Sequence, residues 1–113
     1  MITIYHNNKC SKSRQTLELL QEHNQEVEVI TYLKQPPTAE ELRSVLQKLG
    51  MKPEQLVRKG EAVYKEQFAG KILSDEAWIQ AMVENPILIE RPIVVKGDKA
   101  VIGRPPENVL GLL

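Results

Sequence analysis

The chain has 113 residues, 42% of them hydrophobic, which is enough for one ordinary domain with its own core. Its 15 lysines and arginines balance its 15 aspartates and glutamates, so no global positive field favours nucleic acid or an anionic membrane surface as a partner. One cysteine allows no internal disulfide, and no segment resembles a secretory signal or reaches membrane-spanning length, so we expect a cytoplasmic location.

The first part of the chain predicts a strand, a helix and a second strand. Residues 2–5 form an apolar segment typical of a strand, and residues 27–32 predict a second strand with Val27, Val29 and Thr31 on one face. Between them, the spacing from Ser11 to about His23 predicts a helix that turns Leu17 and Leu20 inward.

A helical segment follows. Thr38 and Glu41 have the spacing of a capping box at the start of a helix. Pro53 favours a further short helix, and Ser74 is a typical cap for a helix that carries Trp78, which we expect in the core.

The last part returns to strands. Residues 93–95 and 100–102 flank a Gly-Asp pair typical of a two-residue hairpin turn, and Pro105 precedes a short terminal helix. The order βαβ, helical segment, ββα predicts an α/β fold. We expect a small mixed β-sheet flanked by helices, its first strand pair parallel, with a helical insertion between the βαβ and ββα parts.

Cys10 is the candidate nucleophile. It lies where the first predicted helix begins, and unpaired N–H groups and the helix dipole favour a thiolate there. A free cysteine with a pKa of about 8.5 is roughly 3% thiolate at neutral pH, and lowering the pKa by two units requires about 2.7 kcal/mol. A helix end supplies about 0.3–1 kcal/mol at an exposed site, so neighbouring cations must contribute; Lys9, Lys12, Arg14 and His6 are the candidates. The alternative, an inert buried cysteine, fits poorly in a polar, cationic loop.

Three motifs carry a family resemblance. They are His-Asn-x-x-Cys-x-x-Ser-Arg at residues 6–14, Leu-Ile-Glu-Arg-Pro-Ile-Val-Val at residues 88–95, and Ile-Gly-Arg-Pro-Pro at residues 102–106. Together they resemble the glutaredoxin-coupled arsenate reductase family, in order and over nearly the whole chain. The resemblance implies one thioredoxin-like, arsenate-reductase-type domain over residues 1–113, and it also implies that the Arg91–Pro92 peptide bond is cis and lies beside the Cys10 loop.

The resemblance further implies a reaction and its partners. Cys10 would attack arsenate to form a thiol-arsenate adduct, which glutathione and a glutaredoxin would resolve with release of arsenite. Glutathione would be a co-substrate, and no bound cofactor is expected. A metal is not expected either, because one cysteine and two histidines give no zinc-like spacing.

Individual residues match positions of the family motifs. Arg58, Arg91 and Arg104 match anion-binding arginines, a role suited to the planar, permanently charged guanidinium. His6 and Ser13 match positions that help to stabilise the thiolate. We expect Arg14 to support the loop and add positive potential before any direct role in substrate binding.

Two departures from the family pattern keep other functions open. Asn8 stands where these reductases often carry proline, and Ser11-Lys12 replaces a Gly-Thr pair. A reductase of the same family with a different substrate is one alternative, and a noncatalytic interaction or regulatory module on the same fold is another. A Cys-x-x-Cys redox switch is excluded, because Ser13 occupies the position of the second cysteine.

Overall fold

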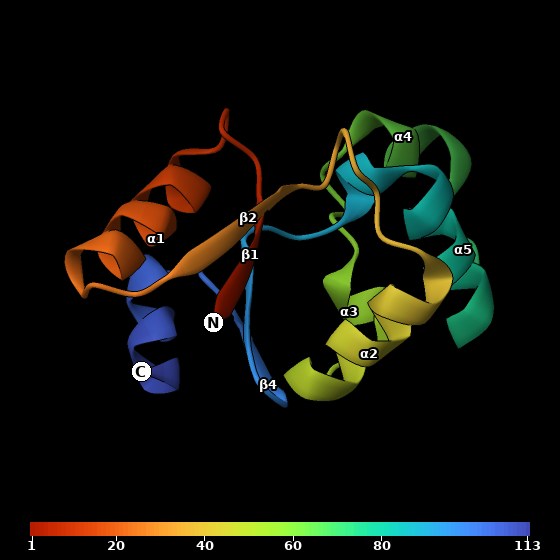
Figure 1. Ribbon diagram of the computed structural model, residues 1–113. Coiled ribbons are helices and arrows are strands. Elements are labelled where there is room, and N and C mark those ends of the chain that lie inside the picture. The colour runs from red at the N-terminus through yellow and green to blue at the C-terminus, as the bar shows by residue number, and fades with distance from the viewer. The chain divides into compact units, whose positions relative to one another are not determined.

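The computed structural model describes residues 1–113 and contains one four-stranded sheet. Its strands, shown in Figure 1, are β1 (Ile2–His6), β2 (Val27–Thr31), β3 (Ile93–Lys96) and β4 (Lys99–Ile102). The strand order is β2-β1-β3-β4, with β1 and β2 parallel and the other two pairs antiparallel. The predicted mixed sheet with a parallel first pair is therefore confirmed.

The chain forms two compact units. The first, Met1–Gln35 with Arg91–Leu113, holds the whole sheet, helix α1 (Ser11–Glu22) and the terminal 3₁₀ helix η2 (Pro106–Leu112). The second, Pro36–Glu90, has helices and one isolated bridge as its regular secondary structure. That the chain acts as a single domain stays a prediction. None of the helices combines the length and the apolar character needed to cross a membrane.

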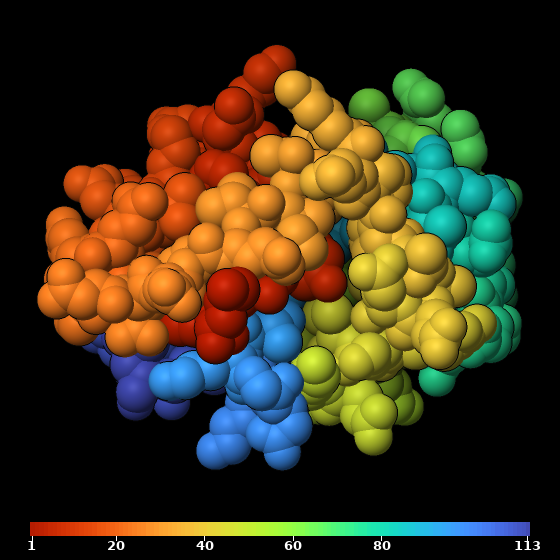
Figure 2. Space-filling model, viewed as in Figure 1, coloured from red at the N-terminus to blue at the C-terminus, as the bar shows by residue number.

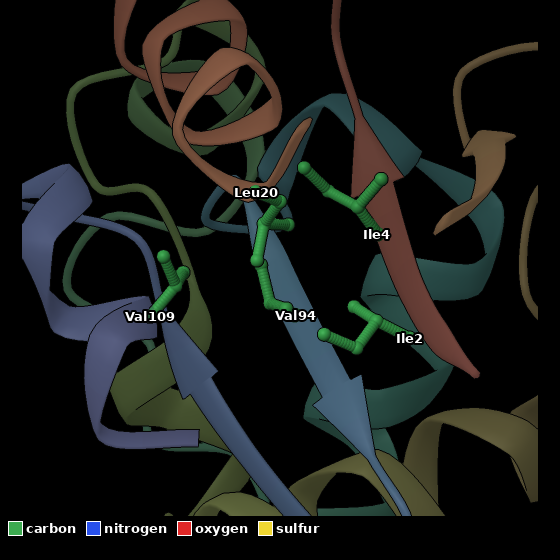
Figure 3. Close-up of a cluster of buried hydrophobic side chains, with 5 residues drawn as sticks. All are labelled: Ile2, Ile4, Leu20, Val94 and Val109. Carbon is green, nitrogen blue, oxygen red and sulfur yellow. The ribbon is translucent and has the colours of Figure 1, made fainter. Parts of the chain in front are cut away.

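The core of the first unit lies between the sheet and its two helices. Strand β1 alternates buried and half-buried residues, as a strand with one face on a core does. Helix α1 and η2 pack against each other, and the buried cluster shown in Figure 3 joins these elements. The cluster consists of Ile2, Ile4, Leu20, Val94 and Val109.

Strand β2 is the outer strand next to β1, and its residues, orange in Figure 2, reach the molecular surface. Val29 at its centre is 42% exposed, although the sequence sets it on one strand face with Val27 and Thr31, as a buried apolar position would be. An edge strand has a neighbour on one side only, which is why its sequence pattern overstates its burial.

The β3–β4 hairpin turns over two residues, as predicted. Lys96 pairs with Lys99, and Gly97 has φ 63°, a left-handed conformation that favours glycine in such turns. The terminal helix also forms, but as a 3₁₀ helix that begins at Pro106.

The second unit consists of helices packed around α5. Its helices are α2 (Ala39–Leu49), α3 (Pro53–Leu56), α4 (Ala62–Gln67), α5 (Asp75–Glu84) and the 3₁₀ helix η1 (Pro86–Leu88). The Thr38–Glu41 capping box forms in both directions, and Ser74 accepts the Ala77 N–H at the start of α5. Trp78 is 1% exposed, which confirms its place in the core, and Tyr64 stacks on it at 6.2 Å between ring centroids.

Candidate active site

The Cys10 loop is built by Asn7, a residue to which the sequence analysis gave no role. The Asn7 side-chain oxygen accepts the Lys9 N–H at 3.0 Å, and the Asn7 carbonyl accepts the Cys10 N–H at 3.0 Å. Asparagine commonly binds the backbone two residues on in this way, and that preference was the available signal. The turn makes Cys10 the residue that caps α1, with its carbonyl accepting the Arg14 N–H at 3.0 Å.

The cysteine sulfur lies in surroundings that favour a thiolate. Burial raises the pKa of Cys10, but hydrogen bonds from the Ser13 and Lys12 backbone N–H groups and the hydrogen bond and positive charge of Arg91 lower the pKa by more. The net effect is a pKa below that of an ordinary cysteine. Backbone donors of the first helical turn and a guanidinium group are therefore the main contributors, and for Lys12 it is the backbone N–H that contributes.

His6 and Ser13 form a buried pair beneath this loop. The His6 Nδ1 lies 2.6 Å from the Ser13 Oγ, and Ser13 Oγ also accepts the Asn7 N–H at 3.1 Å. Burial lowers the pKa of His6, and the charge of Arg14 lowers the pKa further, so both effects favour the neutral ring. The hydroxyl of Ser13 thus binds His6 and the loop, and Ser13 acts on the sulfur through its backbone N–H.

Arg14 makes a hydrogen bond to the backbone of the Cys10 loop. Its Nη1 donates to the Asn8 carbonyl at 2.8 Å, and this bond lies at the exposed surface. The bond uses the backbone carbonyl of Asn8, so Asn8 is joined to α1.

Arg91 and Arg104 are brought together by the hairpin. Ile93 pairs with Ile102, so continuing the antiparallel register sets Arg91 opposite Arg104, although 13 residues separate them. The Arg104 Nη1 donates to the Arg91 carbonyl at 3.4 Å and lies 3.7 Å from the Cys10 Sγ. The Arg91–Pro92 bond is cis, as predicted, and the Arg104–Pro105 bond is cis as well.

Arg58 belongs to the second unit. Its backbone N–H donates to the Leu88 carbonyl at 2.7 Å, and its Nε lies 3.7 Å from the Glu90 carboxylate and 3.9 Å from that of Glu61. Its Nη1 is buried and has no hydrogen-bond partner in the protein. The guanidinium is held by two carboxylates on its Nε side, and its Nη1 keeps a donor for another group.

The site as built can stabilise a thiolate and bind an anion next to it. Cys10, two backbone N–H groups and two arginines meet at the N-terminus of α1, where the helix dipole also favours negative charge. No group of three or more His, Cys, Asp or Glu side chains is arranged to hold a metal ion.

Comparison with known proteins places these features in context. A family model described as "ArsC family" matches residues 5–112. An uncharacterized protein, YfgD of Escherichia coli (strain K12), is 54% identical, covering 99% of this chain and 96% of that protein. An arsenate reductase of Haemophilus influenzae is 43% identical over 99% of this chain and 98% of its own length. The solved structure of an arsenate reductase from Vibrio cholerae superposes with a TM-score of 0.95 at 49% identity, covering 99% of this chain and 97% of that one.

Proposed function

The chain belongs to the ArsC family, and on this premise we propose that it reduces arsenate to arsenite with Cys10 as the nucleophile. The observation that carries the proposal is the position of the Cys10 sulfur, which the Arg91 side chain hydrogen-bonds and which lies 3.7 Å from the Arg104 Nη1. Relatives named arsenate reductase over almost their whole length support the same substrate.

The first step joins sulfur to arsenic. The Cys10 thiolate attacks the arsenic of a bound arsenate and forms an S–As bond, and one arsenate oxygen leaves as water after taking up protons from solvent. A thiolate and an oxyanion repel each other, so this step needs cations that are already in place. Arg91 and Arg104 supply them at the sulfur, and Arg58 is proposed to bind the same anion.

The second step transfers electrons. The glutathione thiolate attacks the Cys10 sulfur, an S–S bond forms, and the electron pair of the broken S–As bond reduces arsenic(V) to arsenic(III), which leaves as arsenite. A glutaredoxin thiolate then takes the glutathione from the mixed disulfide and restores Cys10. An external thiol is required because the chain has one cysteine and cannot close a disulfide of its own.

The test is arsenite production by purified protein without thiol, with glutathione, and with glutathione plus a glutaredoxin. We expect turnover only with thiols, highest in the third condition, and none for Cys10→Ser. Arg91→Ala and Arg104→Ala should lose activity, whereas Arg43→Ala, a matched change at an exposed ion pair with Glu76, should keep it.

Three results would contradict parts of the proposal. Repeated turnover without any thiol would refute the external-thiol mechanism. Equal activity with and without a glutaredoxin would exclude glutaredoxin as a partner in the reaction. Inactivity in all three conditions would reject arsenate as substrate in favour of a different substrate or a noncatalytic role on the same fold.

A further inference from the structure

One close contact joins the three segments that carry the reactive side chains. Thr16 lies on α1, which Cys10 caps; Pro92 follows Arg91, and Gly103 precedes Arg104. Thr16 is 0% exposed, and Pro92 and Gly103 are buried as well. The contact therefore lies within the first unit, as do the cysteine and the two arginines.

Hydrogen bonds define this contact. The Thr16 Oγ1 lies 2.7 Å from the Lys12 carbonyl, a bond common for threonine within a helix, and 3.2 Å from the Gly103 carbonyl, 87 residues away. The Gly103 N–H donates to the Pro92 carbonyl at 2.9 Å, which extends the β3–β4 pairing by one step. The Gly103 N–H is thus bound to the strand, and the Gly103 carbonyl lies within hydrogen-bond distance of a Thr16 hydroxyl whose single proton it shares with the nearer Lys12 carbonyl.

Packing explains why a glycine stands there. A Cβ at Gly103 would lie 2.6 Å from the Thr16 Oγ1, 2.8 Å from the Pro92 Cγ and 2.9 Å from the Thr16 Cγ2. Ordinary contacts begin near 3.4 Å, so a methyl group would force these atoms apart by about 0.5–0.8 Å in a close-packed interior. The backbone of Gly103 is not in the left-handed region, so conformational freedom does not explain the glycine. The close approach of Thr16 and Pro92 to its Cα does.

We propose that Thr16, Pro92 and Gly103 form a positioning contact that sets the distance of Arg91 and Arg104 from the Cys10 sulfur. Each arginine is the direct neighbour of a contact residue, and α1 transmits the position of Thr16 to its first turn. A displacement of several tenths of an ångström at the contact would move both guanidinium groups relative to the sulfur, from which the Arg104 Nη1 lies 3.7 Å away. None of the three contact residues touches the sulfur itself in this scheme, so they act through the arginines and the helix.

The test is the pH dependence of Cys10 alkylation by iodoacetamide in Gly103→Ala, with Gly111→Ala as the matched control. Gly111 lies in the same unit, and nothing lies within 4 Å of a Cβ placed there. We expect the alkylation midpoint of Gly103→Ala to move upward and the rate at neutral pH to fall about tenfold, since misplacements of about 1 Å near reacting atoms can cost about 100-fold. The control should retain the wild-type profile.

A second pair of variants shows whether the effect passes through the contact. Thr16→Ala removes two of the three clashing atoms, so the double variant Thr16→Ala/Gly103→Ala should recover part of the alkylation rate lost in Gly103→Ala. Should Gly103→Ala fail to fold, Thr16→Val, which lacks the hydroxyl but keeps the shape, replaces it and should also shift the midpoint upward. Circular dichroism and urea unfolding establish which variants are folded.

An unchanged alkylation profile in a folded Gly103→Ala, or in Thr16→Val where the former does not fold, would overturn the inference. Equal losses in the single Gly103→Ala and the double variant would overturn it as well. The effect of the contact on arsenate reduction rests on the proposed function, whereas its effect on the Cys10 thiolate does not. Alkylation needs no arsenate, so a shifted midpoint in a protein inactive toward arsenate would refute the proposed substrate and leave the positioning contact standing.

Discussion

Replacing Arg91 by alanine should raise the pKa of Cys10. The Arg91 side chain donates a hydrogen bond to the sulfur and places a positive charge beside it, and both effects lower the pKa of the thiol in the wild-type protein. Alanine removes both and leaves the Ser13 and Lys12 backbone N–H groups and the more distant Arg104 Nη1 as the remaining donors. The thiolate fraction at neutral pH should therefore fall without disappearing.

The size of the effect follows from the charge separation in the site. Opposite charges about 4 Å apart attract by about 1 kcal/mol in bulk water and about 4 kcal/mol at an effective dielectric constant of about 20. Arg104, 3.7 Å from the sulfur and exposed, falls near the lower figure, which corresponds to about fivefold in thiolate. Arg91 is half-buried and adds a hydrogen bond to a charged group, so we expect a loss of about tenfold.

The assay is the rate of iodoacetamide alkylation from pH 5 to 10. The midpoint of the profile reports the thiolate pKa directly, whereas the rate at one pH underestimates the change, because a more basic thiolate is also a better nucleophile. Arg104→Ala should shift the midpoint upward by less than Arg91→Ala. Arg43→Ala should not shift it.

An unchanged midpoint in Arg91→Ala would refute this reasoning. The low pKa of Cys10 would then come from the helix N-terminus alone, and the two arginines would serve only the substrate. A larger shift in Arg104→Ala than in Arg91→Ala would reverse the order of the two contributions and refute the estimate based on burial.

Three further results are expected from the same unit. Ser13→Ala keeps the backbone N–H that donates to the sulfur, so the alkylation midpoint should not change. The variant loses two buried hydrogen bonds, so its free energy of unfolding in urea should fall by about 1–3 kcal/mol. A large upward shift of the midpoint would contradict the role of the backbone N–H. Burial lowers the pKa of His6 in the folded state below the ordinary histidine value of 6.5, so the unfolded state binds more protons as the pH falls. The stability that is complete above pH 6.5 should therefore decrease as the pH drops below it. Urea unfolding should give a lower free energy of unfolding at pH 5 than at pH 8 in the wild type, and a smaller difference in His6→Gln. An equal difference in the two proteins would exclude His6 as the cause. Leu20→Ala, at a position with 0% exposure, should cost about 2–5 kcal/mol in urea unfolding, against little for Leu110→Ala at 41% exposure, and equal costs would contradict the assigned core.

Local signals predicted most of the elements correctly. The Thr38–Glu41 capping box and the Gly97–Asp98 turn depend on groups within a few residues of each other, so their sequence spacing is sufficient evidence. Helix α4 was not predicted because it has neither a capping signal nor a buried face. Glu61 makes no side-chain cap, and none of the six helical residues is buried. Tyr64 of α4 is placed by stacking on Trp78, a tertiary contact.

The sequence by itself determined the order of the strands, the cysteine at the start of a helix and the absence of a second cysteine. Those features follow from local periodicity, from caps and from counting residues. The tertiary structure decided which cations reach the sulfur: the hairpin register sets Arg91 opposite Arg104, and for Lys12 it is the backbone N–H that acts. It also decided that Gly103 stands against Thr16 across 87 residues. Such proximities depend on strand pairing and close packing between distant segments, and no pattern within one segment encodes them.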